Sequence, residues 1–95
     1  MHAVILEVDA DESVVEAARE YLNTKVAPQV REGGAKAGYW IALSKGGGVS
    51  VVVFDSEDQA RQMASMLQVG QPPEPGAPEG VTVRSVDVGE VLASV

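Results

Sequence analysis

Cysteine is absent from this 95-residue sequence, and histidine occurs once, at His2. Without cysteine there is no disulfide bond, thiolate nucleophile, iron–sulfur cluster or cysteine-based zinc site. A lone histidine beside the initiator methionine provides neither the ligand set of a metal ion nor the base of a nucleophilic triad. We therefore expect no metal site and no bound cofactor in this chain.

Long apolar runs and a surplus of basic residues are missing as well. No stretch approaches the roughly 20 apolar residues of a membrane span, and no basic segment followed by an apolar one marks a signal peptide. Together with the lack of cysteine, these absences predict a cytoplasmic protein that does not enter the membrane. The formal net charge of -7 argues against nucleic acid as a partner, because DNA- and RNA-binding proteins need a cationic face that releases phosphate counterions.

Length and composition are those of one small domain covering residues 1–95. The hydrophobic fraction of 45% is ordinary for a globular protein and too high for a disordered one. A chain of this size buries only about two-thirds of the surface that its unfolded form exposes, so its core is thin. Oligomerisation is a common way to enlarge such a core.

The two halves of the sequence nearly repeat each other. In each half, a run rich in branched apolar residues ends at an aspartate and leads into an acidic pair, at residues 4–12 and again at 50–58. Apolar or small residues then recur at helical spacing in both halves. Further along, residues 35–43 align with residues 81–89. The repeat predicts one strand–helix–strand unit that is used twice.

The expected strands cover residues 3–8, 35–44, 49–54 and 81–88. The first helix continues to Gly33-Gly34 and has a kink or a short separate turn over residues 27–32, because Pro28 has no N–H to donate and clashes with the preceding turn. Residues 45–48, Lys-Gly-Gly-Gly, form the turn of a hairpin. Four of the five prolines fall in residues 68–80, which we expect to be a loop before the last strand.

Both helix starts carry capping signals. At the first helix, either Asp9 or Asp11 can cap, and Ser13 with the glutamate one turn later is a competing capping box. At the second helix, Ser56 and Gln59 form a capping box. The start of the first helix is therefore left open between these alternatives.

Asp9 and Asp55 end equivalent strands and are candidates for a pair of catalytic carboxylates. Acid–base catalysis of that kind needs two carboxyl groups close together, with the pKa of one of them raised. Both residues also stand just before a helix, where a carboxylate is stabilising without any catalytic role. We therefore interpret Asp9 and Asp55 as helix-capping residues.

The element order βαββαβ predicts an α+β, ferredoxin-like fold with a four-stranded antiparallel sheet and two helices on one face. The other face should carry polar residues if it meets water. Instead, the strands are apolar on both sides: in the third strand, Val51 and Val53 oppose Val52 and Phe54. Because monomers rarely leave such a face uncovered, we expect a homodimer that packs through the helix-free sheet face.

These features resemble the dimeric α/β barrel superfamily, above all its antibiotic-biosynthesis-monooxygenase-like branch. The resemblance lies in the element order, the two-sided strands and the stretch from Pro28 through Gly38-Tyr39-Trp40 to the strand–Asp–Ser–Glu–helix pattern at residues 53–60. It covers nearly the whole chain. It implies a dimeric α/β barrel with a cavity between each sheet and its helices, but no particular reaction, since members of the superfamily include cofactor-free oxygenases, haem-degrading enzymes and lactone isomerases.

The resemblance does not extend to haem. Haem-degrading members hold the iron through a histidine on a helix, and neither expected helix of this chain contains one.

Four residues are the candidates for a ligand site: Trp40, Tyr39, Tyr21 and Asn23. Trp40, the only tryptophan, is either a packing residue or the wall of a pocket that stacks on a flat ligand. In related oxygenases a tryptophan and an asparagine act together near the substrate, so the resemblance points to Asn23 as the partner of Trp40. A solvent-facing helix position is the alternative for Asn23.

Two functions remain open at this level. The first is a homodimeric barrel that binds a small apolar or aromatic molecule, with monooxygenase-like activity that needs no cofactor. The second is a non-catalytic structural or interaction module whose main property is dimerisation. The lining of any pocket beside Trp40 is the feature that separates them.

Overall fold

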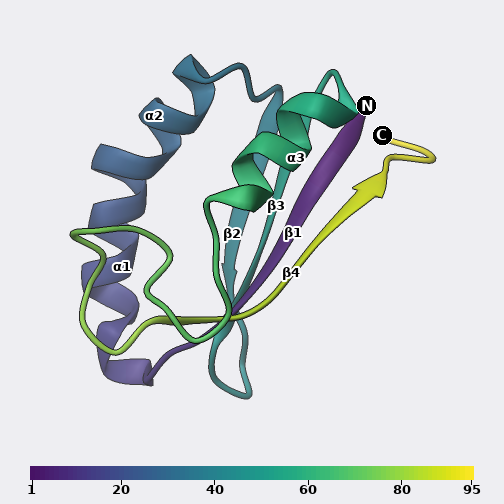
Figure 1. The fold of residues 1–95 in the computed structure, drawn as a ribbon. Coiled ribbons are helices and arrows are strands. Elements are labelled where there is room, and N and C mark those ends of the chain that lie inside the picture. The colour runs from purple at the N-terminus through teal and green to yellow at the C-terminus, as the bar shows by residue number, and fades with distance from the viewer.

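The computed structural model describes residues 1–95 as one four-stranded sheet with helices on one face (Figure 1). The strands are β1 (His2–Asp9), β2 (Ala37–Ala42), β3 (Gly48–Phe54) and β4 (Thr82–Glu90). They lie in the order β2-β3-β1-β4, and every pair of neighbours is antiparallel. The α+β, ferredoxin-like fold expected from the sequence is therefore confirmed.

The first helical segment is one continuous column from Glu12 to Glu32 (Figure 1). It consists of a 3-10 turn η1 (Glu12–Val14), helix α1 (Val15–Tyr21), a π-helical turn η2 (Leu22–Val26) and helix α2 (Ala27–Glu32). The wide π turn lies directly before Pro28, whose ring and missing N–H disturb the normal hydrogen bond to the preceding turn. The expected separate turn over 27–32 is thus joined to the helix before it.

Helix α3 (Glu57–Ser65) starts at the expected capping box, with reciprocal hydrogen bonds between Ser56 and Gln59. At the first helix, the Asp11 carboxylate is the cap and accepts from the Ser13 N–H at 3.1 Å. The interpretation of Asp9 and Asp55 as capping residues is therefore wrong. Each stands before the cap and makes an ion pair instead.

The helical column ends at Gly34 because that glycine adopts a φ of 104°, in the left-handed region that residues with a side chain rarely adopt. The N–H of Gly34 donates to the Arg31 carbonyl at 3.1 Å, and the N–H of Ala35 donates to the Val30 carbonyl at 3.2 Å. This pair of bonds is a Schellman motif, which satisfies the last carbonyls of the helix. The chain then turns directly into β2.

The core is small and lies between the sheet and the helices. Val4, Val52, Phe54 and Ala60 form its buried centre, and residues of α2, α3 and β4 pack around them. Only eight of the 95 residues are buried, and none of these lies in the column from Glu12 to Glu32. The column therefore covers the sheet loosely, whereas α3 is anchored by Ala60.

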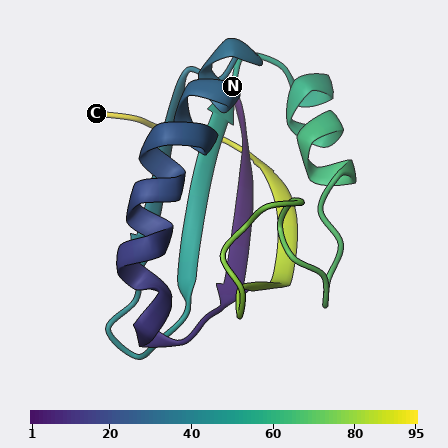
Figure 2. The same ribbon diagram turned by 90° about the vertical axis from the view of Figure 1, so that its left-hand side faces the viewer.

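Residues 68–80 form the expected loop, which lies between the column α1–α2 and helix α3 (Figure 2). At one end, the loop pairs with β4, because the N–H of Gly70 donates to the Val83 carbonyl and the N–H of Val83 donates to the Gln71 carbonyl, both at 2.8 Å. In the middle, the Tyr21 hydroxyl donates to Glu74 at 2.5 Å. The loop is thus tied to both the sheet edge and α1.

The helix-free face of the sheet carries a row of apolar side chains across three strands. Tyr39 of β2, Val51 of β3 and Ile5 of β1 are consecutive partners in one row, and Ile41 and Val49 are partners in the next. Tyr39 is 66% exposed and Ile41 is 47% exposed. Apolar side chains therefore cover this face on β2 and β3 and at Ile5, whereas Glu7 follows Val49 in its row, and no helix covers the face.

Candidate functional site

A small cavity of about 110 Å³ lies between α2 and the edge strand β2. Its lining residues come from α2, from the turn that follows it and from the start of β2: Ala27, Val30, Arg31, Ala35, Lys36, Ala37, Gly38 and Trp40. Typical ligand pockets have volumes of about 300–1,000 Å³. This cavity therefore has room for a single ring or a short branched chain.

Trp40 forms one wall of this cavity because of its place in β2. It lies on the helix side of the sheet, where the register pairs it with Ser50 of β3. Its indole ring lies over Gly38: a Cβ atom on that glycine would come within 3.0 Å of Cη2 of the ring. The absence of a side chain at Gly38 thus allows the ring to lie close to the strand.

Two basic side chains, Arg31 and Lys36, complete the lining. Nζ of Lys36 lies 3.3 Å from Oδ2 of Asp55, in an ion pair whose two side chains are both more than half exposed. Arg31 takes part in no ion pair of the structure. One of the two cations is therefore without a carboxylate partner.

The structure does not gather the four predicted site residues in one place. Tyr39 follows the alternation of β2 and points to the helix-free face, opposite to Trp40. Asn23 is exposed, and its Nδ2 donates to the Arg19 carbonyl of its own helix at 2.8 Å. Only Trp40 lines the cavity.

Tyr21 lies at the end of α1 and is bound to the loop rather than to the cavity. Its partial burial, the hydrogen bond to Glu74 and the negative charge of that carboxylate raise the pKa of the Tyr21 hydroxyl to about 12. Since each of these effects opposes ionisation, Tyr21 remains a neutral donor at physiological pH. In this position it tethers the loop.

Ser50 is a residue that the sequence analysis did not single out. It is only 4% exposed, and its hydroxyl has no hydrogen-bond partner. Its neighbours across the sheet are Leu6 on one side and Trp40 on the other. The one signal in the sequence is a serine within a run of branched residues, at a position on the helix side of β3.

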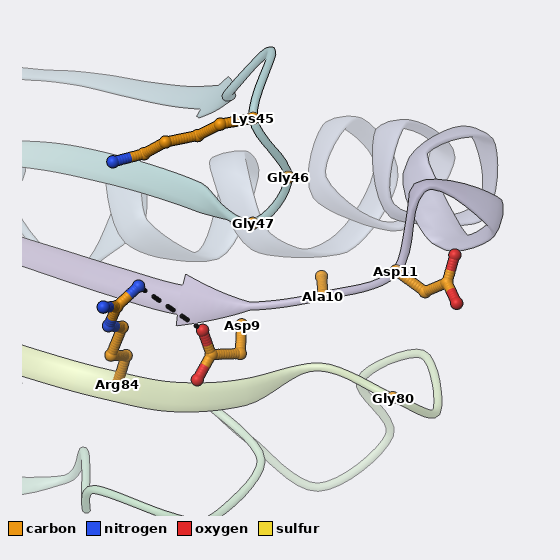
Figure 3. A pocket seen from close by; sticks show the side chains of 8 residues that line it. All are labelled: Asp9, Ala10, Asp11, Lys45, Gly46, Gly47, Gly80 and Arg84. Atoms are coloured by element: carbon orange, nitrogen blue, oxygen red, sulfur yellow. Dashed lines mark ion pairs between the residues drawn. The ribbon is translucent and has the colours of Figure 1, made fainter.

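A larger notch of about 550 Å³ opens at the end of the sheet where the hairpin turn, the end of β1 and the start of β4 meet (Figure 3). Its lining is polar, and its charged groups are largely engaged with the protein. Arg84 lies 3.7 Å from Asp9, Asp11 caps the first helix, and Lys45 extends away from Asp11. Because its walls are open and almost without apolar side chains, we regard it as a surface notch and the Trp40 cavity as the candidate site.

Asp9 and Asp55 lie at opposite ends of the sheet. The register of β1 with β3 places Val8 opposite Gly48, near the hairpin turn, and His2 opposite Phe54 at the other end. The two aspartates therefore cannot act as a carboxylate pair. No group of at least three histidine, aspartate or glutamate side chains is placed to hold a metal ion.

None of the helices has the length and apolar character needed to cross a membrane.

Comparisons with protein-family models, with curated proteins and with solved structures gave no match. The fold therefore defines the class of the protein: an α+β, ferredoxin-like domain with a largely apolar helix-free face and a small cavity beside its only tryptophan.

Proposed function

We propose that this protein is a homodimeric barrel that binds a small apolar or aromatic molecule. Two copies pack through their helix-free sheet faces, and each copy holds its ligand beside Trp40, between α2 and β2. The observation that carries the binding function is the cavity itself, whose lining is mainly apolar and includes the indole ring. The resemblance of the sequence to the dimeric α/β barrel superfamily supports the same proposal.

The dimer is supported by the distribution of side chains over the helix-free face. Apolar residues occupy it on β2 and β3 and at Ile5 of β1, whereas its polar and charged residues, Glu7 of β1 and Ser85 and Asp87 of β4, lie together on one side. A continuous apolar surface with a polar edge is typical of a protein interface. Tyr39, exposed on the edge strand β2 of this surface, is the kind of residue that anchors such contacts.

A second copy of the chain is the partner that best fits this face. With eight buried residues, the monomer has little core of its own, and it gains most from a permanent interface. The part of this face on β2 and β3 carries no charge and is self-complementary, so a two-fold axis through it brings apolar side chains together. Light scattering behind gel filtration tests this proposal: the particle should have about twice the chain mass of 9.9 kDa.

The matched variants for the dimer are Ile41→Glu and Met66→Glu. Ile41 lies on the helix-free face, and Met66 is 70% exposed at the end of α3 on the other side of the sheet. We expect the Ile41 variant to be a folded monomer or to shift strongly towards one, because a charge in an apolar interface is costly. Met66→Glu should remain a dimer. A wild-type monomer at micromolar concentration would refute the dimer.

The ligand site can be tested through Trp40, because a single tryptophan gives a single indole N–H resonance. Titration with benzamide, a neutral molecule with one ring, should shift that resonance and saturate. Ala27→Leu should abolish the shift, since Ala27 lines the cavity and the larger side chain fills it. Ala17→Leu adds the same bulk at an exposed position of α1 and should bind as the wild type does. An indole resonance that does not respond to the probe would refute binding at this site.

A non-catalytic structural module is the second candidate. It is favoured by one observation: Tyr39, Tyr21 and Asn23 all point elsewhere, so none of them lies beside Trp40 as a partner for a reaction there. The same observation gives no support to a monooxygenase-like reaction, because the Asn23 amide is bound to its own helix. If the protein dimerises and its indole resonance ignores the probe, this second candidate is the function.

A further inference from the structure

The cavity beside Trp40 has a charge pattern that differs from that of the whole chain. Acidic residues outnumber basic ones fourteen to seven in the sequence, yet none of the residues that line the cavity is acidic. Two of the seven basic residues, Arg31 and Lys36, lie there, while the other lining residues are small, apolar or aromatic. A site of this composition is matched to an anion with an apolar body.

The two cations are available to a ligand. Arg31 has no carboxylate partner in the structure. Lys36 shares its charge with Asp55 at 3.3 Å, but exposed pairs of this kind contribute little and exchange readily. The place of Arg31 in the last turn of α2 is favourable for the helix dipole, which explains a positive charge there but not the apolar cavity beside it.

We infer that the ligand is a small carboxylate: a single ring or short branched chain lies against Trp40 and Val30, and its carboxylate group binds Arg31 and Lys36. A guanidinium group presents its N–H donors in a planar fork that matches the two oxygens of a carboxylate. Lys36 already forms an ion pair with the carboxylate of Asp55, so this side of the cavity is suited to a carboxylate group. This inference rests on the proposed ligand site and names the chemical class of its ligand.

Benzoate and benzamide provide the test, because they have nearly the same shape and differ in charge. Both are titrated into the wild-type protein at low ionic strength while the Trp40 indole resonance is followed. We expect benzoate to bind about three- to tenfold more tightly than benzamide, the preference that one or two partly exposed ion pairs produce. Added salt should weaken the binding of benzoate and leave that of benzamide unchanged.

Arg31→Gln and Arg19→Gln are the matched variants. Both remove one positive charge from an exposed position of the same helical column, but Arg19 is paired with Glu16 at 3.3 Å and does not line the cavity. Arg31→Gln should abolish most of the preference for benzoate, and Arg19→Gln should retain it. Circular dichroism confirms that both variants are folded.

The possible results separate the inference from the proposed function. A preference for benzoate that is lost in Arg31→Gln alone supports a carboxylate ligand. Equal affinity for the two probes overturns the carboxylate and leaves the apolar site standing. A preference for benzoate that survives in Arg31→Gln overturns the binding of the carboxylate by Arg31. If neither probe shifts the indole resonance, both the site and its ligand class are wrong.

Discussion

Replacing Ser50 with alanine should stabilise the folded protein. The Ser50 side chain is 4% exposed and its hydroxyl has no partner, so folding removes the water bound to this group without a replacement hydrogen bond. An unsatisfied buried polar group of this kind costs about 1–3 kcal/mol. Alanine keeps the Cβ atom and loses only the oxygen, which removes a few dispersion contacts of about 0.1–0.2 kcal/mol each.

The expected net effect of Ser50→Ala is an increase of about 1 kcal/mol in the free energy of unfolding. For a domain of about 60–100 residues, this corresponds to a rise of roughly 4–8 °C in Tm. Urea denaturation measures the change directly. Wild type and variant must be compared at one protein concentration, because dimerisation would make the apparent stability depend on it.

Ser44→Ala is the control for this measurement, since Ser44 is an exposed serine of the turn between β2 and β3. Its replacement should change the free energy of unfolding by less than about 0.5 kcal/mol. If Ser50→Ala is less stable than the wild type, the hydroxyl has a hydrogen-bond partner in solution, such as an internal water. The view of Ser50 as an unsatisfied group would then be wrong.

Two further predictions concern the tether of the loop and the end of the helical column. The pKa of Tyr21 is raised from 10.0 to about 12 on folding, so its contribution to stability is complete below pH 10 and is lost as the pH rises through 12. The urea midpoint of the wild type should therefore fall over this pH range relative to that of Tyr21→Phe. Parallel pH profiles of the two proteins would contradict this prediction. Gly34→Ala should lower the free energy of unfolding by about 1 kcal/mol, because Gly34 has a φ of 104°. Its control is Gly33→Ala at an ordinary helical φ of -74°, which should be close to neutral, and equal effects of the two substitutions would refute the conformational explanation.

The features that could be predicted from the sequence are those set by neighbouring residues. Alternating branched residues indicate the strands, Ser56 with Gln59 indicates the start of α3, and the run of glycines indicates the hairpin turn. The apolar character of both sheet faces also follows from alternation alone. Each of these signals lies within one element, so the fold class followed from their order.

The details of the site could not be predicted in this way, because they depend on contacts between distant segments. The cavity beside Trp40 exists only when α2 lies across the start of β2, and it needs the ring to rest on Gly38. The bond from Tyr21 to Glu74 joins two segments that have no common pattern. The sequence also predicts the distortion caused by Pro28 one turn too late. It is expected over residues 27–32 but lies before the proline, as a π turn at Leu22–Val26.

The internal repeat explains the fold, and the positions at which the two halves differ need a separate explanation. Both halves form the same strand–helix–strand unit, which accounts for the sheet and for the position of each helix. The halves differ in the side chains that the aligned strands β2 and β4 carry on each face of the sheet. Trp40 corresponds to Val86 on the helix side, and Tyr39 corresponds to Ser85 on the helix-free side.

The helices of the two units also differ, in how closely they pack against the sheet. In the second unit, α3 buries Ala60 and packs closely, as a purely structural element does. In the first unit, the longer column buries no residue and leaves a cavity beside an aromatic ring and two cations. If folding alone shaped both units, there would be no reason for the first to keep a looser helix and the only tryptophan. The asymmetry within the repeat therefore favours the first unit, and the two faces of β2 in particular, as the part of the molecule that carries the function.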